Sequence, residues 1–156
     1  MNERGFSLIE VMVAMVVLAF GLLGAMASFQ SADHGLQEGA KGTQALALAE
    51  SRLEAKRATP WQTLLSDDMN ADGVPDVVMH DDGQPPDRVS GDGIFTAGTE
   101  TEGISLIWTV QPDRSGRLQH AASVVILAAA SYSLPNGQRR TIRLGTLRAN
   151  PVYVGL

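Results

Sequence analysis

The longest hydrophobic run of this chain lies close to its first residue. The run covers residues 6–29, FSLIEVMVAMVVLAFGLLGAMASF, and Glu10 is its one charged residue. As an α-helix these 24 residues would reach about 36 Å, more than the hydrocarbon core of a bilayer at roughly 30 Å. We therefore predict a membrane-spanning helix. A carboxylate inside such a helix is costly, so Glu10 is expected to have a function and a charged partner.

A second helical pattern follows this run, over residues 30–59. Its apolar side chains recur at helical spacing and predict one apolar stripe, made of Leu36, Ala40, Leu46, Ala47, Ala49 and Leu53. The cations Arg52, Lys56 and Arg57 are predicted to lie on solvated faces. Cations also suit the C-terminal end of a helix, which we place before Thr59-Pro60. The two patterns together predict one long helix whose second half is amphipathic and lies on a soluble head.

The last third of the chain has the composition of β-strands. Residues 103–111, 120–133 and 138–149 are rich in β-branched, aromatic and other apolar side chains, and they predict three antiparallel strands. The sequence Pro135-Asn136-Gly137 between the last two is a strong hairpin signal. In the last strand Ile142 and Leu144 alternate with polar residues, so their side of the strand is expected to face the helix. The predicted fold class is α+β, with a long N-terminal helix packed on a small antiparallel β-sheet over residues 103–156.

Composition limits what the head can contain. A chain of 156 residues with one membrane span has room for one modest domain outside the membrane. It has no cysteine, so no disulfide can stabilise its loops. The net charge of −5 is unevenly distributed, because residues 66–103 contain ten acidic residues and one arginine, a local charge of −9. We assign residues 60–102 to an acidic loop region.

The acidic region contains a pattern of oxygen ligands typical of calcium-binding loops. Side-chain oxygens occupy positions 1, 3, 5 and 9 of an EF-hand-like loop, the sharp turn falls on a glycine, and a backbone carbonyl is available at position 7. These residues are Asp68, Asn70, Asp72 and Asp76, with Gly73 at the turn and Val74 at position 7. A bound cation would offset the local charge of −9, so we predict that this region binds calcium.

The loop is not a standard EF-hand. Position 12, where an EF-hand has a bidentate glutamate, is Met79, so a further ligand would have to come from elsewhere. The candidates are Asp81, Asp82, Asp87 and Asp92. The alternative is that these Asp, Asn, Gly and Pro residues only form turns.

The sequence gives no support for an enzyme or for a nucleic-acid-binding protein. It contains no nucleophile elbow, no phosphate-binding glycine loop and no HExxH motif, so we expect no catalytic residues and no small-molecule substrate. The basic end formed by Arg139, Arg140, Arg143 and Arg148 lacks the interleaved aromatic residues that stack on single-stranded nucleic acid.

The residues around the start of the apolar run resemble a known processing signal. Residues 5–11, GFSLIEV, follow a short polar leader and are similar to the prepilin signature of type IV pilins and type II secretion pseudopilins. The resemblance implies that a prepilin peptidase removes residues 1–5 by cutting between Gly5 and Phe6, and that the new terminal amine of Phe6 is N-methylated. It also implies that Glu10 attracts the terminal amine of a neighbouring subunit during assembly, and that the head has a pilin-like α+β fold.

Two further parts of the chain, each made of two segments, resemble minor pilins in particular. They are residues 14–26 with 45–57, and residues 108–113 with 139–150. The resemblance implies a subunit that lies in the inner membrane with its head in the periplasm, and then primes or caps a type IV pilus outside the cell beside the major pilin and other minor pilins. Two alternatives remain open: a minor pseudopilin of a type II secretion system, and a calcium-binding membrane-anchored adhesin.

Overall fold

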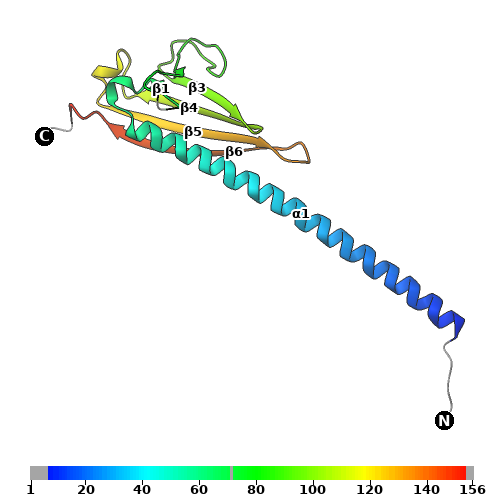
Figure 1. The fold of residues 1–156 in the computed structure, drawn as a ribbon. Coiled ribbons are helices and arrows are strands. Elements are labelled where there is room, and N and C mark those ends of the chain that lie inside the picture. The colour runs from blue at the N-terminus through cyan, green and yellow to red at the C-terminus, as the bar shows by residue number, and fades with distance from the viewer. Residues whose placement is uncertain (1–6, 71, 154–156) are drawn as a thin grey trace. The chain divides into compact units, whose positions relative to one another are not determined.

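The computed structural model describes residues 7–70 and 72–153. The chain forms two compact units, residues 1–40 and residues 41–156. One helix contributes to both units, and all strands belong to the second (Figure 1). The α+β fold class predicted from the sequence is confirmed.

Helix α1 runs from Leu8 to Ala58 without interruption, 51 residues in all. It begins where the carbonyl of Ser7 accepts the amide of Glu10 at 3.0 Å. It ends where the amide and the hydroxyl of Thr59 both donate to the carbonyl of Ala55, at 3.0 and 2.8 Å, and the next residue is Pro60. No proline occurs earlier, so no backbone donor is missing within the helix. The predicted single long helix and its C-terminal end are therefore confirmed.

Four antiparallel strands form the main sheet in the order β3-β4-β5-β6. Their bounds are Phe95–Thr101 for β3, Ile104–Pro112 for β4, Ser123–Ser133 for β5 and Arg139–Ala149 for β6. The expectation of three strands was wrong by one, because residues 95–101 belong to β3 and not to the acidic loop region. Their sequence, FTAGTET, is short and weakly apolar. The strand is specified by its pairing with β4 through a two-residue turn, Glu102-Gly103, in which both residues have positive φ (52° and 73°).

The predicted hairpin at Pro135-Asn136-Gly137 joins β5 to β6. The carbonyl of Leu134 accepts the amide of Gly137 at 2.9 Å, and the amide of Leu134 donates to Gln138 at 2.8 Å. Gly137 has a φ of +80°, which glycine adopts without strain. This turn sets the register between β5 and β6, in which Ser133 lies opposite Arg139 and Ser123 lies opposite Ala149.

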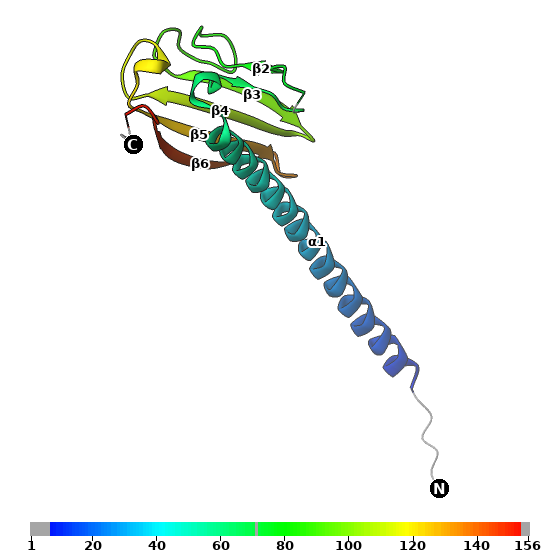
Figure 2. The ribbon, with the colours of Figure 1, turned by 60° about the vertical axis from the view of Figure 1, so that its left-hand side comes forward.

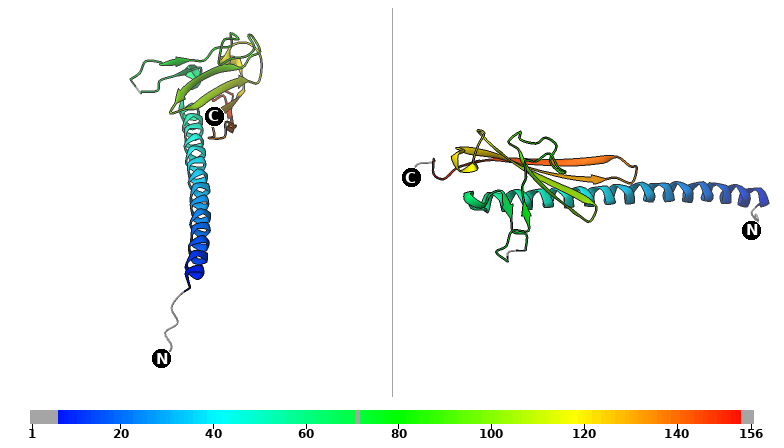
Figure 3. Two further views of the ribbon diagram at one scale, coloured as in Figure 1. Left: turned by 90° about the vertical axis from the view of Figure 1, so that its right-hand side faces the viewer. Right: turned by 90° about the horizontal axis from the view of Figure 1, so that it is seen from above.

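Shorter elements surround the sheet. Two 3-10 helices, η1 (Trp61–Thr63) and η2 (Leu118–His120), lie close together. Strands β1 (Ser66–Asp67) and β2 (Val77–Val78) form a separate two-stranded hairpin. This hairpin carries the loop of residues 68–76 away from the main sheet (Figure 3).

The core of the second unit lies between the sheet and residues 41–58 of α1 (Figure 2). On the sheet side, alternate residues of β4 and β5 are buried, among them Trp108 and Ile126. On the helix side the buried apolar residues are small: Ala45 and Ala49 have no exposed surface. A Cβ atom on Gly42 would lie only 3.1 Å from the hydroxyl of Tyr132, so the helix and the sheet approach closely there.

The predicted apolar stripe on α1 was only partly correct. Ala49 is buried, and Leu53 packs partly buried against the core. Leu36, Ala40 and Ala47 are exposed. The face that meets the sheet contains Gly42, Ala45 and Ala49, and glycine and alanine contribute little to a hydrophobicity pattern, so the pattern did not identify this face. On the other side of the core, Ile142 and Leu144 of β6 pack against it as predicted.

Candidate functional site

The predicted processing site precedes α1 in the sequence. Gly5 and Phe6, the expected cleavage and methylation residues, lie outside the described residues. Glu10 is in the first turn of α1, and its side chain is exposed. An acidic side chain is favourable in this position because the first turn carries the positive end of the helix dipole. Glu10 is therefore available to a partner.

In the part of the chain that the structure describes, the large apolar side chains on both sides of Glu10 are exposed. Leu8, Phe20 and Phe29 are 80%, 72% and 76% exposed. This part of α1 is long and apolar enough to cross a membrane, and none of the apolar stretch is buried. A water-exposed apolar surface of this extent is unfavourable, so the helix requires lipid or other apolar helices around it.

The predicted calcium loop is closed by its own hydrogen bonds. The carboxylate of Asp68 accepts the amides of Asp72 (3.2 Å) and Gly73 (2.7 Å). The carboxylate of Asp76 accepts the amide of Met69 at 2.6 Å, and Asp72 accepts the amide of Val74 at 2.8 Å. The side chain of Asn70 contacts Asp72, donating through Nδ2 at 3.0 Å. The five expected ligand residues thus lie in one loop. Its side-chain carboxylates accept hydrogen bonds from its own backbone amides.

The four supplementary aspartates organise a second loop. Asp81 accepts three amides, from Gly91 (2.7 Å), Asp92 (3.1 Å) and Gly93 (3.0 Å). Asp82 and Asp92 each accept the amide two residues further on. In the described parts of the chain no three His, Cys, Asp or Glu side chains gather closely enough to hold a metal ion. Calcium binding therefore stays a prediction.

Asp87 is the most enclosed of these aspartates. It is 7% exposed and accepts the amides of Gly83 at 2.7 Å and Arg88 at 2.8 Å. The hydrogen bond from Gly83 is the main reason that the pKa of Asp87 lies below its ordinary value, and other backbone amides add to the effect. The ionised carboxylate of Asp87 thus stabilises the loop by accepting these backbone amides.

A buried ionic cluster connects α1 to the rest of the head. Lys56 has no exposed surface, and its Nζ lies 2.9 Å from Asp67 Oδ2 and donates to the carbonyl of Leu64 at 2.6 Å. The prediction that Lys56 and Arg52 lie on solvated faces was wrong. Arg52 contacts the other oxygen of Asp67 at 3.2 Å, and its guanidinium lies 4.5 Å from the ring centroid of Trp108. Desolvation lowers the pKa of Lys56, and the hydrogen bond to Asp67 opposes this change.

The sequence carried no clear signal for this cluster. Asp67 was one of ten acids in a region of high charge, and nothing in the local pattern separates it from its exposed neighbour Asp68. The contact that distinguishes it comes from β4, where Nε1 of Trp108 donates to Asp67 Oδ2 at 2.9 Å. We interpret the cluster as structural, because the one carboxylate of Asp67 compensates the buried charge of Lys56 and also contacts Arg52.

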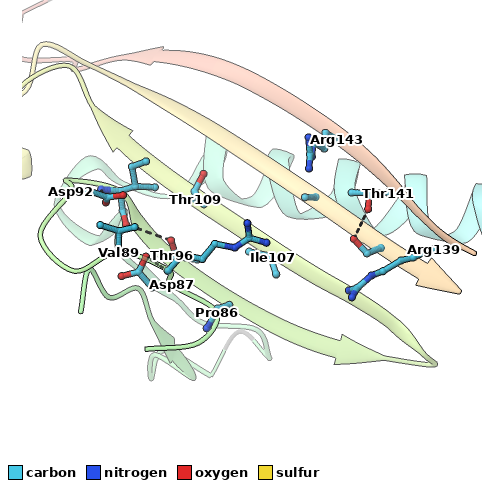
Figure 4. Close-up of a pocket in the computed structure, with 14 residues that line it drawn as sticks. Pro86, Asp87, Val89, Asp92, Thr96, Ile107, Thr109, Arg139, Thr141 and Arg143 are labelled. Carbon is cyan, nitrogen blue, oxygen red and sulfur yellow. Dashed lines mark hydrogen bonds between the residues drawn. The ribbon is translucent and has the colours of Figure 1, made fainter. Parts of the chain in front are cut away.

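A groove of about 670 Å³ lies on the face of the main sheet opposite α1. Its floor comes from outward-facing residues of neighbouring strands, including Thr96 of β3, Ile107 and Thr109 of β4 and Thr141 of β6 (Figure 4). The loop after β2 forms one wall with Asp87 and Val89, and Arg139 and Arg143 of β6 lie on the other side. Strand alternation produces this arrangement, because Arg139, Thr141 and Arg143 all lie on one face of β6.

The arginines of β6, which form the basic end of the chain, therefore lie on both faces of the sheet. Arg148 lies on the helix side, where its guanidinium donates to the carbonyl of Lys56 at 2.9 Å. Arg140, paired with the buried Tyr132, is on that side as well. Arg139 and Arg143 belong to the groove, and Arg88 joins them from the acidic segment. Sequence reasoning treated the four arginines of β6 as one group and did not find the groove.

The comparisons with known proteins bear on the N-terminus. Residues 1–26 match the family described as "Prokaryotic N-terminal methylation motif". No curated protein and no solved structure matches the chain. The matched residues include Gly5, Phe6 and Glu10 and run directly into the exposed apolar part of α1. The chain therefore carries a prepilin-type signal at the start of an apolar helix, which supports a protein similar to type IV pilins or pseudopilins.

Proposed function

We propose that this protein is a minor pilin. In this proposal a prepilin peptidase cuts between Gly5 and Phe6, and the mature chain begins with N-methylated Phe6. The subunit then waits in the inner membrane with its head in the periplasm, before it primes or caps a type IV pilus beside the major pilin and other minor pilins. Its role is structural and not catalytic. The particular minor pilin that it resembles is the one called PilV, the type IV pilus modification protein.

The proposal rests on one observation: the methylation motif extends into the apolar part of α1, whose side chains are exposed. The motif covers residues 1–26, and in α1 every large apolar side chain from Leu8 to Phe29 is exposed. Such a helix is stable in lipid before assembly and against other apolar helices after it. Glu10 would then be neutralised by the terminal amine of a neighbouring subunit, since both charges are unfavourable when left alone in a low-dielectric layer.

Mass spectrometry of the N-terminal peptide tests the processing step. In cells that contain the peptidase, the expected peptide begins with methylated Phe6. The Gly5→Val variant should remain in the membrane with its leader intact, because a branched side chain replaces the glycine at the scissile bond. The matched control, Gly24→Val, changes a glycine within α1 whose surroundings are open. It should be cleaved normally, and an intact leader on the wild-type protein would refute the proposal.

A pseudopilin of a type II secretion system, most similar to the one called GspI, is the second candidate, because the methylation motif supports it equally. The two candidates differ in phenotype. Deletion of the gene should reduce the number of surface pili if the protein is a minor pilin, and should block protein export without loss of pili if it is a pseudopilin.

A further inference from the structure

The groove on the outer face of the sheet has three cationic side chains without partners. Arg88, Arg139 and Arg143 all line it, and all three are exposed. Among the described residues, the ion pairs involve only Arg52, Lys56, Arg57 and Arg114 as cations. The guanidinium groups around the groove are therefore free to bind an anion. Arginine presents a planar pair of donors that matches a carboxylate in a bidentate arrangement.

The acidic groups at the groove do not compete for these arginines. Asp87 accepts backbone amides at 2.7 and 2.8 Å, and Asp92 accepts the amide of Ile94 at 2.9 Å. Both carboxylates hold the loop that forms the wall. They nevertheless make the surroundings negative, because the segment of residues 66–103 has a charge of −9. A densely charged polyanion such as DNA is repelled by these surroundings, whereas a ligand with one or two acidic groups is accommodated.

The floor of the groove supplies hydroxyl groups. Thr96, Thr109, Thr141 and Ser131 line it, and the hydroxyls of Ser131 and Thr141 contact each other at 2.8 Å. Each hydroxyl both donates and accepts, which suits a ligand that carries several hydroxyls of its own. Between them lie the apolar surfaces of Ile107 and Ala129. None of the described residues that line the groove is aromatic, so they offer no platform for stacking of nucleic-acid bases.

We infer that this groove binds an acidic saccharide, a sugar chain that carries one or two carboxylates. Arg139 and Arg143, four residues apart and thus roughly 13 Å along β6, would bind the carboxylates. The threonine and serine hydroxyls would bind the sugar hydroxyls, and Ile107 would contact an apolar face of a sugar ring. The volume of about 670 Å³ is within the range of roughly 300–1,000 Å³ of small-molecule sites. The inference does not depend on assembly of the protein into a pilus.

Calorimetric titration of the full chain tests this inference, in micelles of an amine-oxide detergent that contains no sugar or acid. The probe is digalacturonate, which has two carboxylates and several hydroxyls. Its dimethyl ester keeps the hydroxyls and lacks the charge, a capped Glu-Glu dipeptide keeps the charge and lacks the hydroxyls, and a short DNA duplex represents a polyanion. We expect saturable binding of digalacturonate, and binding at least roughly tenfold weaker for the other three.

The variants locate the site. Arg139→Gln and Arg143→Gln should each weaken digalacturonate binding by roughly tenfold or more, because each removes a charge-assisted hydrogen bond. Arg140→Gln is the matched control, since it makes the same change on the same strand but on the opposite face of the sheet, and it should leave the affinity unchanged. Thr109→Val, which removes one hydroxyl at nearly constant volume, should weaken the binding too.

Several results would overturn the inference. Absence of binding at millimolar digalacturonate would do so, as would equal affinity for the dimethyl ester. Equal or tighter binding of the dipeptide or of DNA would show that the groove recognises charge alone. An equal loss of affinity in Arg140→Gln and Arg143→Gln would place the binding outside the groove.

Discussion

Lys56 and Asp67 form an ion pair at 2.9 Å in which the lysine side chain has no exposed surface and the aspartate side chain is 4% exposed. Residues 57–66 separate them in the sequence, and these include the end of α1 and the whole of η1. The pair fixes the end of the helix against β1 and, through Trp108, against the main sheet. An uncompensated charge in this position would be strongly unfavourable, so the buried Lys56 requires the carboxylate of Asp67.

Asp67→Asn should lower the stability of the head considerably. The substitution leaves Lys56 buried without a counter-ion, which typically reduces the free energy of unfolding by about 3–5 kcal/mol. For a domain of this size, the melting temperature should fall by roughly 10 °C or more, as measured by circular dichroism of the full chain in micelles. The control is Glu54→Gln, which removes an exposed pair with Arg57 and should change the free energy by less than about 1 kcal/mol. Equal melting temperatures for Asp67→Asn and wild type would contradict a structural role of the cluster.

Asp87 should contribute to the pH dependence of stability in acid. Its pKa in the folded protein lies below the ordinary value of 3.8, so the unfolded chain binds more protons than the folded chain in the window below 3.8. The contribution is therefore complete above pH 3.8 and is lost as the pH falls through the folded pKa. Asp87→Asn should be less stable than wild type at neutral pH and should lose less stability on acidification.

Melting curves recorded from neutral pH down to about pH 2 measure this effect, since they cover the window below the reference pKa of aspartate. The matched control is Asp92→Asn in the same loop, where the carboxylate accepts one amide and is exposed. It should change the curves less than Asp87→Asn. Parallel pH profiles for wild type and Asp87→Asn would show that the buried carboxylate does not stabilise the loop.

Glu10 should be needed for assembly but not for processing. Glu10→Ala removes the only acidic residue of the apolar run, so membrane insertion should become easier and cleavage after Gly5 should continue. Incorporation into pili should fall sharply, because no carboxylate remains to pair with the terminal amine of a neighbour. Immunoblots of sheared pili measure the ratio of this subunit to the major pilin. Glu10→Asp retains the charge and should restore part of the incorporation, whereas an unchanged ratio in Glu10→Ala would rule out the pairing.

Calcium should stabilise the head if the loop of residues 68–76 binds it. A ligand that binds only the native state adds about 2.7 kcal/mol at a hundredfold excess over Kd, so a chelator should lower the melting temperature by several degrees. Without a glutamate at position 12 we expect a micromolar to millimolar affinity. Asp72→Ala should abolish the difference between calcium and chelator, and Glu54→Ala, an exposed acid on α1, should preserve it. Identical calorimetric curves for the wild type in calcium and in chelator would show that these aspartates only form turns.

The sequence was most informative where structure depends on neighbouring residues. The long helix, its end before Thr59-Pro60 and the hairpin at Pro135-Asn136-Gly137 were all predicted, because helix periodicity and turn residues act over a few positions. The sequence was least informative where burial is decided by distant contacts. The helix face that meets the sheet is formed by Gly42, Ala45 and Ala49, and such small residues stand out only when the partner surface is known.

By itself, the sequence determined the processing signal, the apolar helix and the α+β class, because each depends on the order of residues in a continuous segment. The tertiary structure alone decided that Lys56 is buried, since a lysine is tolerated in a core only when a distant carboxylate such as Asp67 is brought to it. It also decided that residues 95–101 form β3 and that Arg88 lines the same groove as Arg139 and Arg143. These features depend on strand pairing between segments far apart in the chain, and no local pattern of residues contains that information.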